Sequence, residues 1–230
     1  MASESKSFGS PTGYILAPVA ERGDRTSESR NLIEIGLVYG LILVAVWTPQ
    51  GHLNSLVSLA ALCLTILLTA LAPYSFRELG LTRPLNGANT TLALGGLLIV
   101  IIGTAGMLTR AFGPPQHLPL HRAWQYAIWA LLQEFLLQSF MFTRLESIFG
   151  SRRGVFAAAS LFAIAHFPSP LLTVLSFLGA IFFCETFRRY RNLYPLGLVH
   201  AGLGLTVAAS LPDPILHHMR VGLGYLMYHV

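Results

Sequence analysis

The sequence predicts an all-α protein, a polytopic integral membrane bundle of about seven transmembrane helices. Of its 230 residues, 53% are apolar and only 11% are charged, and the mean hydropathy is +0.60. Soluble domains carry about 25% charged residues, so this composition excludes a water-soluble globule. The net charge of +5 does not indicate a nucleic acid partner, because the cations lie between long apolar runs. The two cysteines both fall inside such runs, which excludes a disulfide scaffold and a CxxC site.

Residues 1–30 are predicted to form a disordered cytoplasmic tail. They are polar and rich in serine, and they contain no apolar run that could form a core. A cleaved signal peptide would place a short apolar region close behind a basic start. Here the first apolar run begins only after Arg30, so we expect that run to be a retained first span.

Seven apolar windows follow and make up a predicted transmembrane helical domain over residues 31–212. A spanning helix needs about 20 residues, and most of the windows are long enough. The fifth is short, and we expect it to end near Phe167 and Pro168, because the residue before a proline disfavours the helical conformation. Residues 213–230 are interrupted by prolines and histidines and are predicted to form a short, interfacial C-terminal tail. The windows are 31–49, 53–74, 92–112, 123–144, 154–168, 170–187 and 193–211.

The distribution of cations predicts the orientation in the membrane. With seven spans and the amino terminus inside, twelve of the 15 Lys and Arg residues lie in cytoplasmic segments. Only Arg110, Arg122 and Arg220 lie in outer segments. Positive residues are enriched in cytoplasmic loops, so we expect a cytoplasmic amino terminus. The compact chain, without an organellar signal, predicts a prokaryotic inner membrane.

Three ionisable side chains fall in the middle of predicted spans, namely Glu134, His166 and His200. Each costs about 2.5–3.5 kcal/mol on insertion scales, so each needs a partner or a function. At 1.5 Å per residue, all three lie roughly 10–18 Å from the cytoplasmic face. A single intramembrane histidine is more often a packing partner, but three groups at one depth favour a functional site. We expect their side chains to face one internal cavity.

Two glutamines lie close to Glu134 in the fourth window. Gln138 follows it by one helical turn, so Ala130, Glu134, Gln138 and Met141 share a face that must point into the bundle. Gln133 lies about 100° around the helix from Glu134 and need not reach the same partner.

The stretches 133–138, 162–166 and 200–204 resemble, in this order, the motifs of the CPBP family, the CAAX proteases and bacteriocin-processing intramembrane endopeptidases. The family signature is EExxxR on one helix, FxxxH on the next, and a later histidine followed four residues on by asparagine. The resemblance covers about residues 75–210. It implies an intramembrane endopeptidase that hydrolyses a peptide bond of a membrane-associated protein or peptide, with Glu134, His166 and His200 as its catalytic residues.

Three positions depart from the signature. Gln133 stands in place of the first glutamate, which is usually assigned as the general base, Gln138 replaces the arginine, and Gly204 replaces the asparagine. An amide cannot take a proton from water at neutral pH, so Gln133 cannot be the base. The resemblance leaves Gln133, Gln138, Phe162 and Gly204 as supporting residues.

Two mechanisms are compatible with these residues. In the favoured one, Glu134 and His166 activate a water, and His200 donates a hydrogen bond to the developing oxyanion, a contribution of about 3 kcal/mol. That mechanism needs no cofactor or metal. In the other, Glu134, His166 and His200 bind a catalytic zinc ion. The sequence lacks an HExxH helix and a spare carboxylate to act as base, which disfavours zinc.

Two other functions remain open on the sequence alone. The chain could be a catalytically inactive relative that binds a peptide or a membrane-protein partner, as a chaperone or an immunity factor does. It could also be a small transporter that uses Glu134, His166 and His200 as a proton relay, although the resemblance disfavours this.

Overall fold

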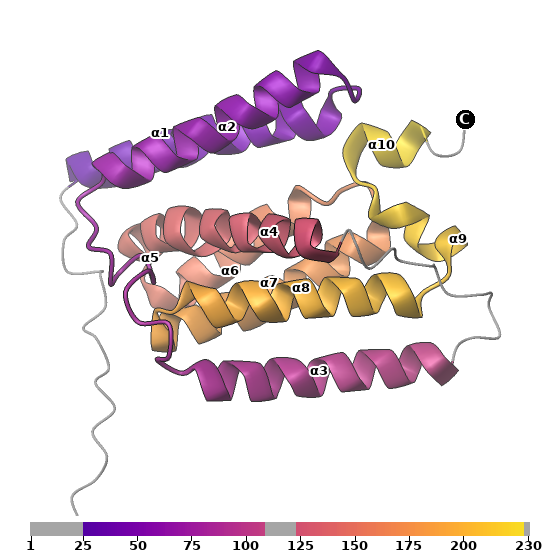
Figure 1. Ribbon diagram of the computed structural model, residues 1–230. Coiled ribbons are helices and arrows are strands. Elements are labelled where there is room, and N and C mark those ends of the chain that lie inside the picture. The colour runs from indigo at the N-terminus through magenta and orange to yellow at the C-terminus, as the bar shows by residue number, and fades with distance from the viewer. Residues whose placement is uncertain (1–24, 109–122, 228–230) are drawn as a thin grey trace, which may run out of the picture.

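The computed structural model describes residues 25–108 and 123–227, and within these ranges the chain is helical, with no strand (Figure 1). The predicted tail falls on residues 1–24, outside the described residues, and on residues 25–30, which belong to the first helix. The long helices are α1 (Arg25–Trp47), α2 (His52–Leu71), α3 (Ala88–Leu108), α4 (Ala123–Glu134), α6 (Ser151–Ile164), α7 (Pro170–Tyr190) and α8 (Leu193–Ser210). The shorter elements are the π-helix η4 (Phe135–Phe142), α5 (Thr143–Phe149), α9 (Asp213–Leu216), the 3₁₀-helix η5 (His217–Met219) and α10 (Gly222–Leu226).

Five of these helices, α1, α2, α3, α7 and α8, are long and apolar enough to cross a membrane. The integral membrane character is therefore supported, but the predicted count of seven spans is not confirmed. The fourth window is divided among α4, η4 and α5, none of which reaches the required length alone. The fifth window forms α6, whose 14 residues rise about 21 Å, less than the ~30 Å hydrocarbon core of a bilayer.

The helices are arranged in three layers (Figure 1). An antiparallel hairpin of α1 and α2 lies on one side, α3 lies on the opposite side, and α4 to α8 form the layer between them. Small residues allow α3 to approach α8 closely. A side chain at Gly95 would collide with Val199, and one at Gly106 would collide with Ser210.

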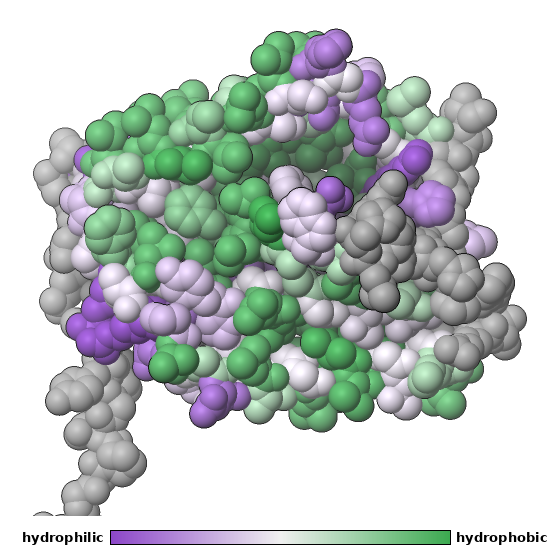
Figure 2. Space-filling view, in the orientation of Figure 1, coloured by the Kyte–Doolittle hydropathy of each residue, from purple (hydrophilic) through white to green (hydrophobic). Residues whose placement is uncertain are grey.

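Apolar side chains cover much of the face of the protein seen in Figure 2. Large apolar residues are exposed on α2 and α3, at Leu53, Leu56, Leu71, Leu97, Val100 and Met107. A soluble protein rarely exposes apolar surface of this extent, whereas a bilayer accepts it. Most fully buried large side chains lie instead in the middle layer, among them Leu137, Phe140, Phe142, Phe187 and Leu196.

The C-terminal segment packs on the body of the protein beside α1 and the turn after α6. The Gly222 amide donates a hydrogen bond to the Phe167 carbonyl at 2.9 Å. A side chain at Gly222, whose φ is +54°, would collide with Val46 of α1. These contacts hold α10 against the end of the hairpin where α1 turns into α2.

Candidate active site

Glu134 is the last residue of α4 and is fully enclosed in the protein. Ala130, Gln138 and Met141 are buried with it, in agreement with the shared face expected from the sequence. The helix widens into the π-helix η4 directly after Glu134. Short π-helical segments occur frequently at functional sites.

Glu134 joins His200 on α8 to Gln138 on η4. Its Oε1 lies 2.8 Å from His200 Nδ1, and its Oε2 accepts a hydrogen bond from Gln138 Nε2 at 3.0 Å. Both carboxylate oxygens therefore have a partner inside the protein. When Glu134 is ionised, His200 Nδ1–H is the donor, which leaves Nε2 as the ring nitrogen available to another molecule.

His166 lies in the turn just after α6, which ends at Ile164, and not within a helical span as the sequence predicted. The helix ends earlier because Pro168 follows and α7 begins at Pro170. His166 Nδ1 is 2.7 Å from the Phe162 carbonyl oxygen. A carbonyl only accepts hydrogen bonds, so Nδ1 carries the proton and the neutral ring has its lone pair on Nε2.

Phe162 lies against both imidazoles. Its ring centroid is 4.8 Å from that of His166 and 6.2 Å from that of His200. Phe183 of α7 stacks on the other side of His200, with centroids 5.2 Å apart and planes 20° apart. Each histidine is therefore oriented by aromatic contacts and by one hydrogen bond at Nδ1. Phe162, four residues before His166, supports the site by packing against both rings.

Gly204 lies one helical turn after His200, at the position where the family pattern has asparagine. A side chain at Gly204 would collide with the hydroxyl of Tyr126 on α4. Tyr126 therefore fills the space that a larger residue would need. Tyr126 was not among the site residues predicted from the sequence. The signal was Gly204, because a glycine where the family pattern has asparagine leaves room for another side chain.

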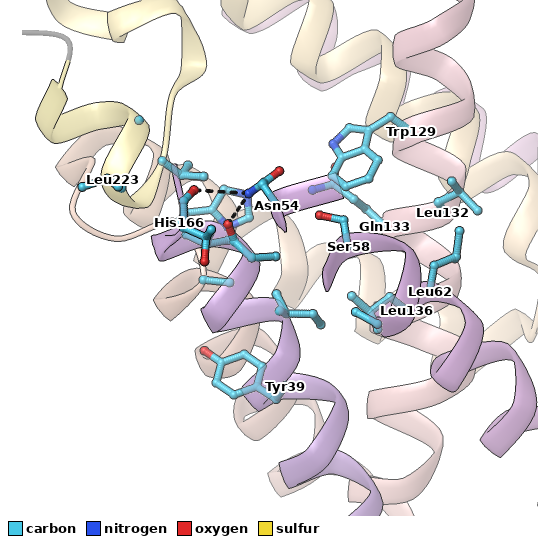
Figure 3. Close-up of a pocket in the computed structure, with 18 of the residues that line it drawn as sticks. Tyr39, Asn54, Ser58, Leu62, Trp129, Leu132, Gln133, Leu136, His166 and Leu223 are labelled. Carbon is cyan, nitrogen blue, oxygen red and sulfur yellow. Dashed lines mark hydrogen bonds between the residues drawn. The ribbon is translucent and has the colours of Figure 1, made fainter. Parts of the chain in front are cut away.

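A cavity of about 970 Å³ lies between the α1–α2 hairpin on one side and α4, the turn after α6 and α10 on the other (Figure 3). The polar and aromatic residues that line it include Tyr39, Asn54, Ser58, Trp129, Gln133 and His166. Glu134 and His200 are not among its lining residues. Of the three site residues, only His166 lines this cavity, and a common cavity for all three stays a prediction. Gln133 and Glu134 project from α4 in different directions, so Gln133 meets the cavity and Glu134 turns to α8.

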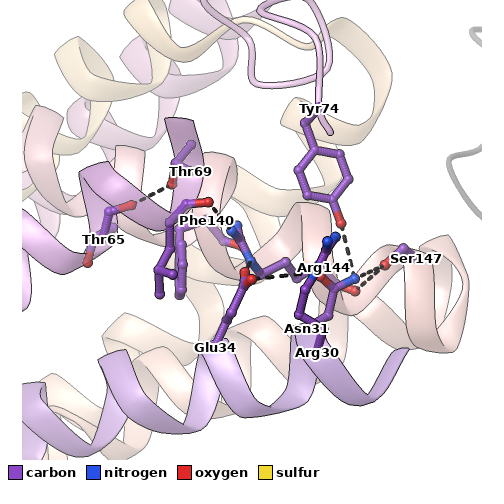
Figure 4. Close-up of polar contacts among 10 residues, drawn as sticks. Arg30, Asn31, Glu34, Thr65, Thr69, Tyr74, Phe140, Arg144 and Ser147 are labelled. Carbon is purple, nitrogen blue, oxygen red and sulfur yellow. Dashed lines mark hydrogen bonds and ion pairs between the residues drawn. The ribbon is translucent and has the colours of Figure 1, made fainter. Parts of the chain in front are cut away.

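A buried ion pair holds the hairpin over this cavity (Figure 4). Arg144 of α5 is completely buried, and its Nε donates to Glu34 of α1 at 2.8 Å. Its Nη2 donates to the Leu68 carbonyl of α2 at 2.9 Å, and its guanidinium lies 4.0 Å from the centroid of the Phe140 ring. Arg144 is one of the twelve cations that the predicted topology places in cytoplasmic segments. In the structure it contacts both helices of the hairpin and attaches them to the middle layer.

Within residues 25–108 and 123–227, no group of three or more His, Cys, Asp or Glu side chains is placed to hold a metal ion. The sequence-derived ligand set of Glu134, His166 and His200 thus does not converge on one metal position. Glu134 and His200 are in contact, whereas His166 uses Nδ1 on a carbonyl and turns toward the cavity.

Residues 115–206 match the family described as type II CAAX prenyl endopeptidase, Rce1-like. The matched range contains Glu134, His166 and His200, but not the α1–α2 hairpin that forms one wall of the cavity. It confirms the resemblance to the CPBP family that the sequence motifs indicated. No curated protein and no solved structure matches the chain.

Proposed function

Since residues 115–206 form an Rce1-like domain consistent with the CPBP family, we propose that this membrane protein is an intramembrane endopeptidase of the CAAX-protease type. Its substrate is a membrane-associated protein or peptide, and it works without a metal or other cofactor. The observation that carries the proposal is the Glu134–His200 contact of 2.8 Å, together with a second oriented histidine, His166, that packs against the same Phe162 ring as His200.

The geometry favours a different role for Glu134 from the one expected on sequence. A general base must reach the water it activates, but Glu134 is fully enclosed and both of its oxygens already accept hydrogen bonds. His166 has a free Nε2 and lines the cavity. We therefore assign the base to His166. Glu134 becomes the positioning residue that orients His200 and stabilises its protonated form, as a carboxylate behind a catalytic imidazole does.

Hydrolysis then proceeds in two steps. His166 Nε2 takes a proton from water as the water oxygen bonds to the carbonyl carbon. His200 Nε2–H donates a hydrogen bond to the resulting oxyanion, which requires the scissile carbonyl to reach past Phe162 of the cavity wall toward α8. The carbon–nitrogen bond breaks as His166 returns the proton to the leaving amine. One water is consumed, and one new carboxyl and one new amino terminus are formed.

Gln133 in place of the usual glutamate is the observation that favours a second candidate, a catalytically inactive relative that binds a peptide or a membrane-protein partner. The two candidates differ in whether a peptide bond is broken. The zinc mechanism differs from both, because a chelator such as 1,10-phenanthroline would abolish zinc-dependent activity and leave the activity proposed here unchanged.

The experiment is a comparison of protein termini in membranes from cells that express the wild type, His166→Ala or no protein. We expect a small set of new termini with the wild type only. His52→Ala is the matched control, since His52 is exposed at the start of α2 and is not among the cavity residues. The same termini in the His166→Ala sample would contradict the proposed role of His166. No new terminus in any sample would favour the inactive relative.

A further inference from the structure

The cavity beside His166 has a wall of mixed chemistry. Most of the wall is apolar, but the side chains of Ser58 on α2 and Gln133 on α4 also line it. Neither side chain makes a hydrogen bond with any described residue. Both are labelled at the cavity in Figure 3.

Asn54 lies on the same wall but, unlike Ser58 and Gln133, it has hydrogen-bond partners within the protein. Its Nδ2 donates to the carbonyls of Ala45 at 2.6 Å and Thr48 at 3.3 Å, drawn as dashed lines in Figure 3. Asn54 therefore closes the turn between α1 and α2. Ser58, one helical turn further along α2, has no such structural task.

We infer that this cavity binds the substrate as an extended peptide segment, whose main chain is hydrogen-bonded by Gln133 and Ser58. The inference rests on the proposed function, because it names how the same site takes its substrate. A peptide that enters an apolar cavity must satisfy its main-chain N–H and C=O groups there. The Gln133 amide offers both donors and an acceptor, and the Ser58 hydroxyl offers one donor and an acceptor, so each matches a peptide group.

The position and size of the cavity fit this occupant. Its volume of about 970 Å³ is near the upper end of the range of roughly 300–1,000 Å³ for small-molecule sites, which suits a short peptide segment. A segment held at Gln133 would lie in the cavity that His166 lines. An acyl chain would also fit the apolar wall, but it would leave the polar groups of Gln133 and Ser58 unpaired. Gln133, which stands where the family has its usual general base, is then a residue that binds the substrate main chain.

The test is photo-crosslinking of the full-length protein in lipid nanodiscs, with wild type and Glu134→Gln in parallel so that the result does not depend on cleavage. One probe is a short, apolar, end-blocked peptide that carries photo-leucine, and the other is a diazirine-bearing palmitic acid. Ser58→Ala and Gln133→Met remove the proposed partners. Ser55→Ala and Gln125→Met are the matched controls, because both residues are exposed on the same helices and neither lines the cavity.

We expect the peptide to label residues 58–62 and 129–136, and palmitic acid not to displace it. Loss of one neutral hydrogen bond should raise the half-saturating peptide concentration about fivefold for each cavity variant, and the controls should leave it unchanged. Displacement by palmitic acid, or cavity variants that bind the peptide like wild type, would overturn the inference. If the peptide binds as expected but is never cleaved by the wild type, the inference stands and the proposed function fails.

Discussion

Glu134→Gln is the substitution that separates the contribution of Glu134 to catalysis from its contribution to the stability of the fold. The amide keeps an acceptor for His200 Nδ1–H but removes the negative charge that stabilises the protonated imidazole. In the proposed mechanism His200 donates a hydrogen bond to the oxyanion, and removal of one such donor lowers kcat about 10²–10³-fold in a serine protease. We expect a loss of the same order, about 3–4 kcal/mol of transition-state stabilisation. The loss should appear in kcat with little change in KM, because Glu134 does not line the substrate cavity.

The fold should tolerate this substitution for a reason visible in the structure. An amide at position 134 would set its nitrogen against Gln138 Nε2, which now donates to the carboxylate. Gln138 Oε1 is buried and has no partner. A flip of the Gln138 amide would present that oxygen to the new donor and restore the hydrogen bond. We therefore expect the free energy of unfolding to change by no more than about 1 kcal/mol.

The assay is the initial rate of peptide cleavage by the purified protein in liposomes, paired with thermal unfolding in detergent. Gln133→Met in the same assay is the comparison, because it should raise KM and leave kcat largely intact. Full activity of Glu134→Gln would refute the assignment of Glu134 as the residue that positions His200 for catalysis. A large fall in unfolding temperature would instead show that its role is structural.

Three further predictions concern the rest of the structure. Arg144→Met should lower the free energy of unfolding by about 3 kcal/mol, because it leaves the Glu34 carboxylate with only the exposed Arg30, at 3.5 Å, as its cation; adding Glu34→Gln should recover most of the loss in thermal unfolding, and additive losses would contradict the pairing. Gly204→Asn should lower both stability and activity, because its side chain would meet the Tyr126 hydroxyl, and Tyr126→Ala should restore the space; a harmless Gly204→Asn would contradict this packing. Reporters fused within 188–191 and after the last residue should lie on opposite sides of the membrane, as the cation distribution predicts, and a shared side would mean that the predicted topology is wrong.

The helices were largely predictable because their signal is local. Within the described residues, each of the seven apolar windows overlaps a helical segment, which hydropathy in a window reports directly. Hydropathy does not report whether a helix is continuous. The π-helix after Glu134 has no signal in a hydropathy window, and α6 ends at Ile164, a few residues before the end that Pro168 predicted, so the number of helices long enough to span was not predicted correctly.

The candidate site was predictable in part. Equal depth correctly suggested that Glu134 and His200 can meet, and they are in contact. Depth does not report which way a side chain turns, so it did not predict that only His166 of the three lines the cavity between the α1–α2 hairpin and α4. The burial of two cations was missed as well. Arg144 and Arg191 pair with Glu34 and Glu146 across more than 40 residues of sequence, a distance that no local pattern encodes.

The most direct test of the central claim is a single-turnover measurement with purified protein in liposomes and a peptide that spans one of the termini found in cells. We expect the wild type to cleave this peptide in the presence of 1,10-phenanthroline. Cleavage in ¹⁸O-labelled water should place one labelled oxygen on the new carboxyl group. His166→Ala should bind the peptide without cleaving it. Wild-type protein that binds the peptide and leaves it intact would contradict the account, as would cleavage that stops when the chelator is added.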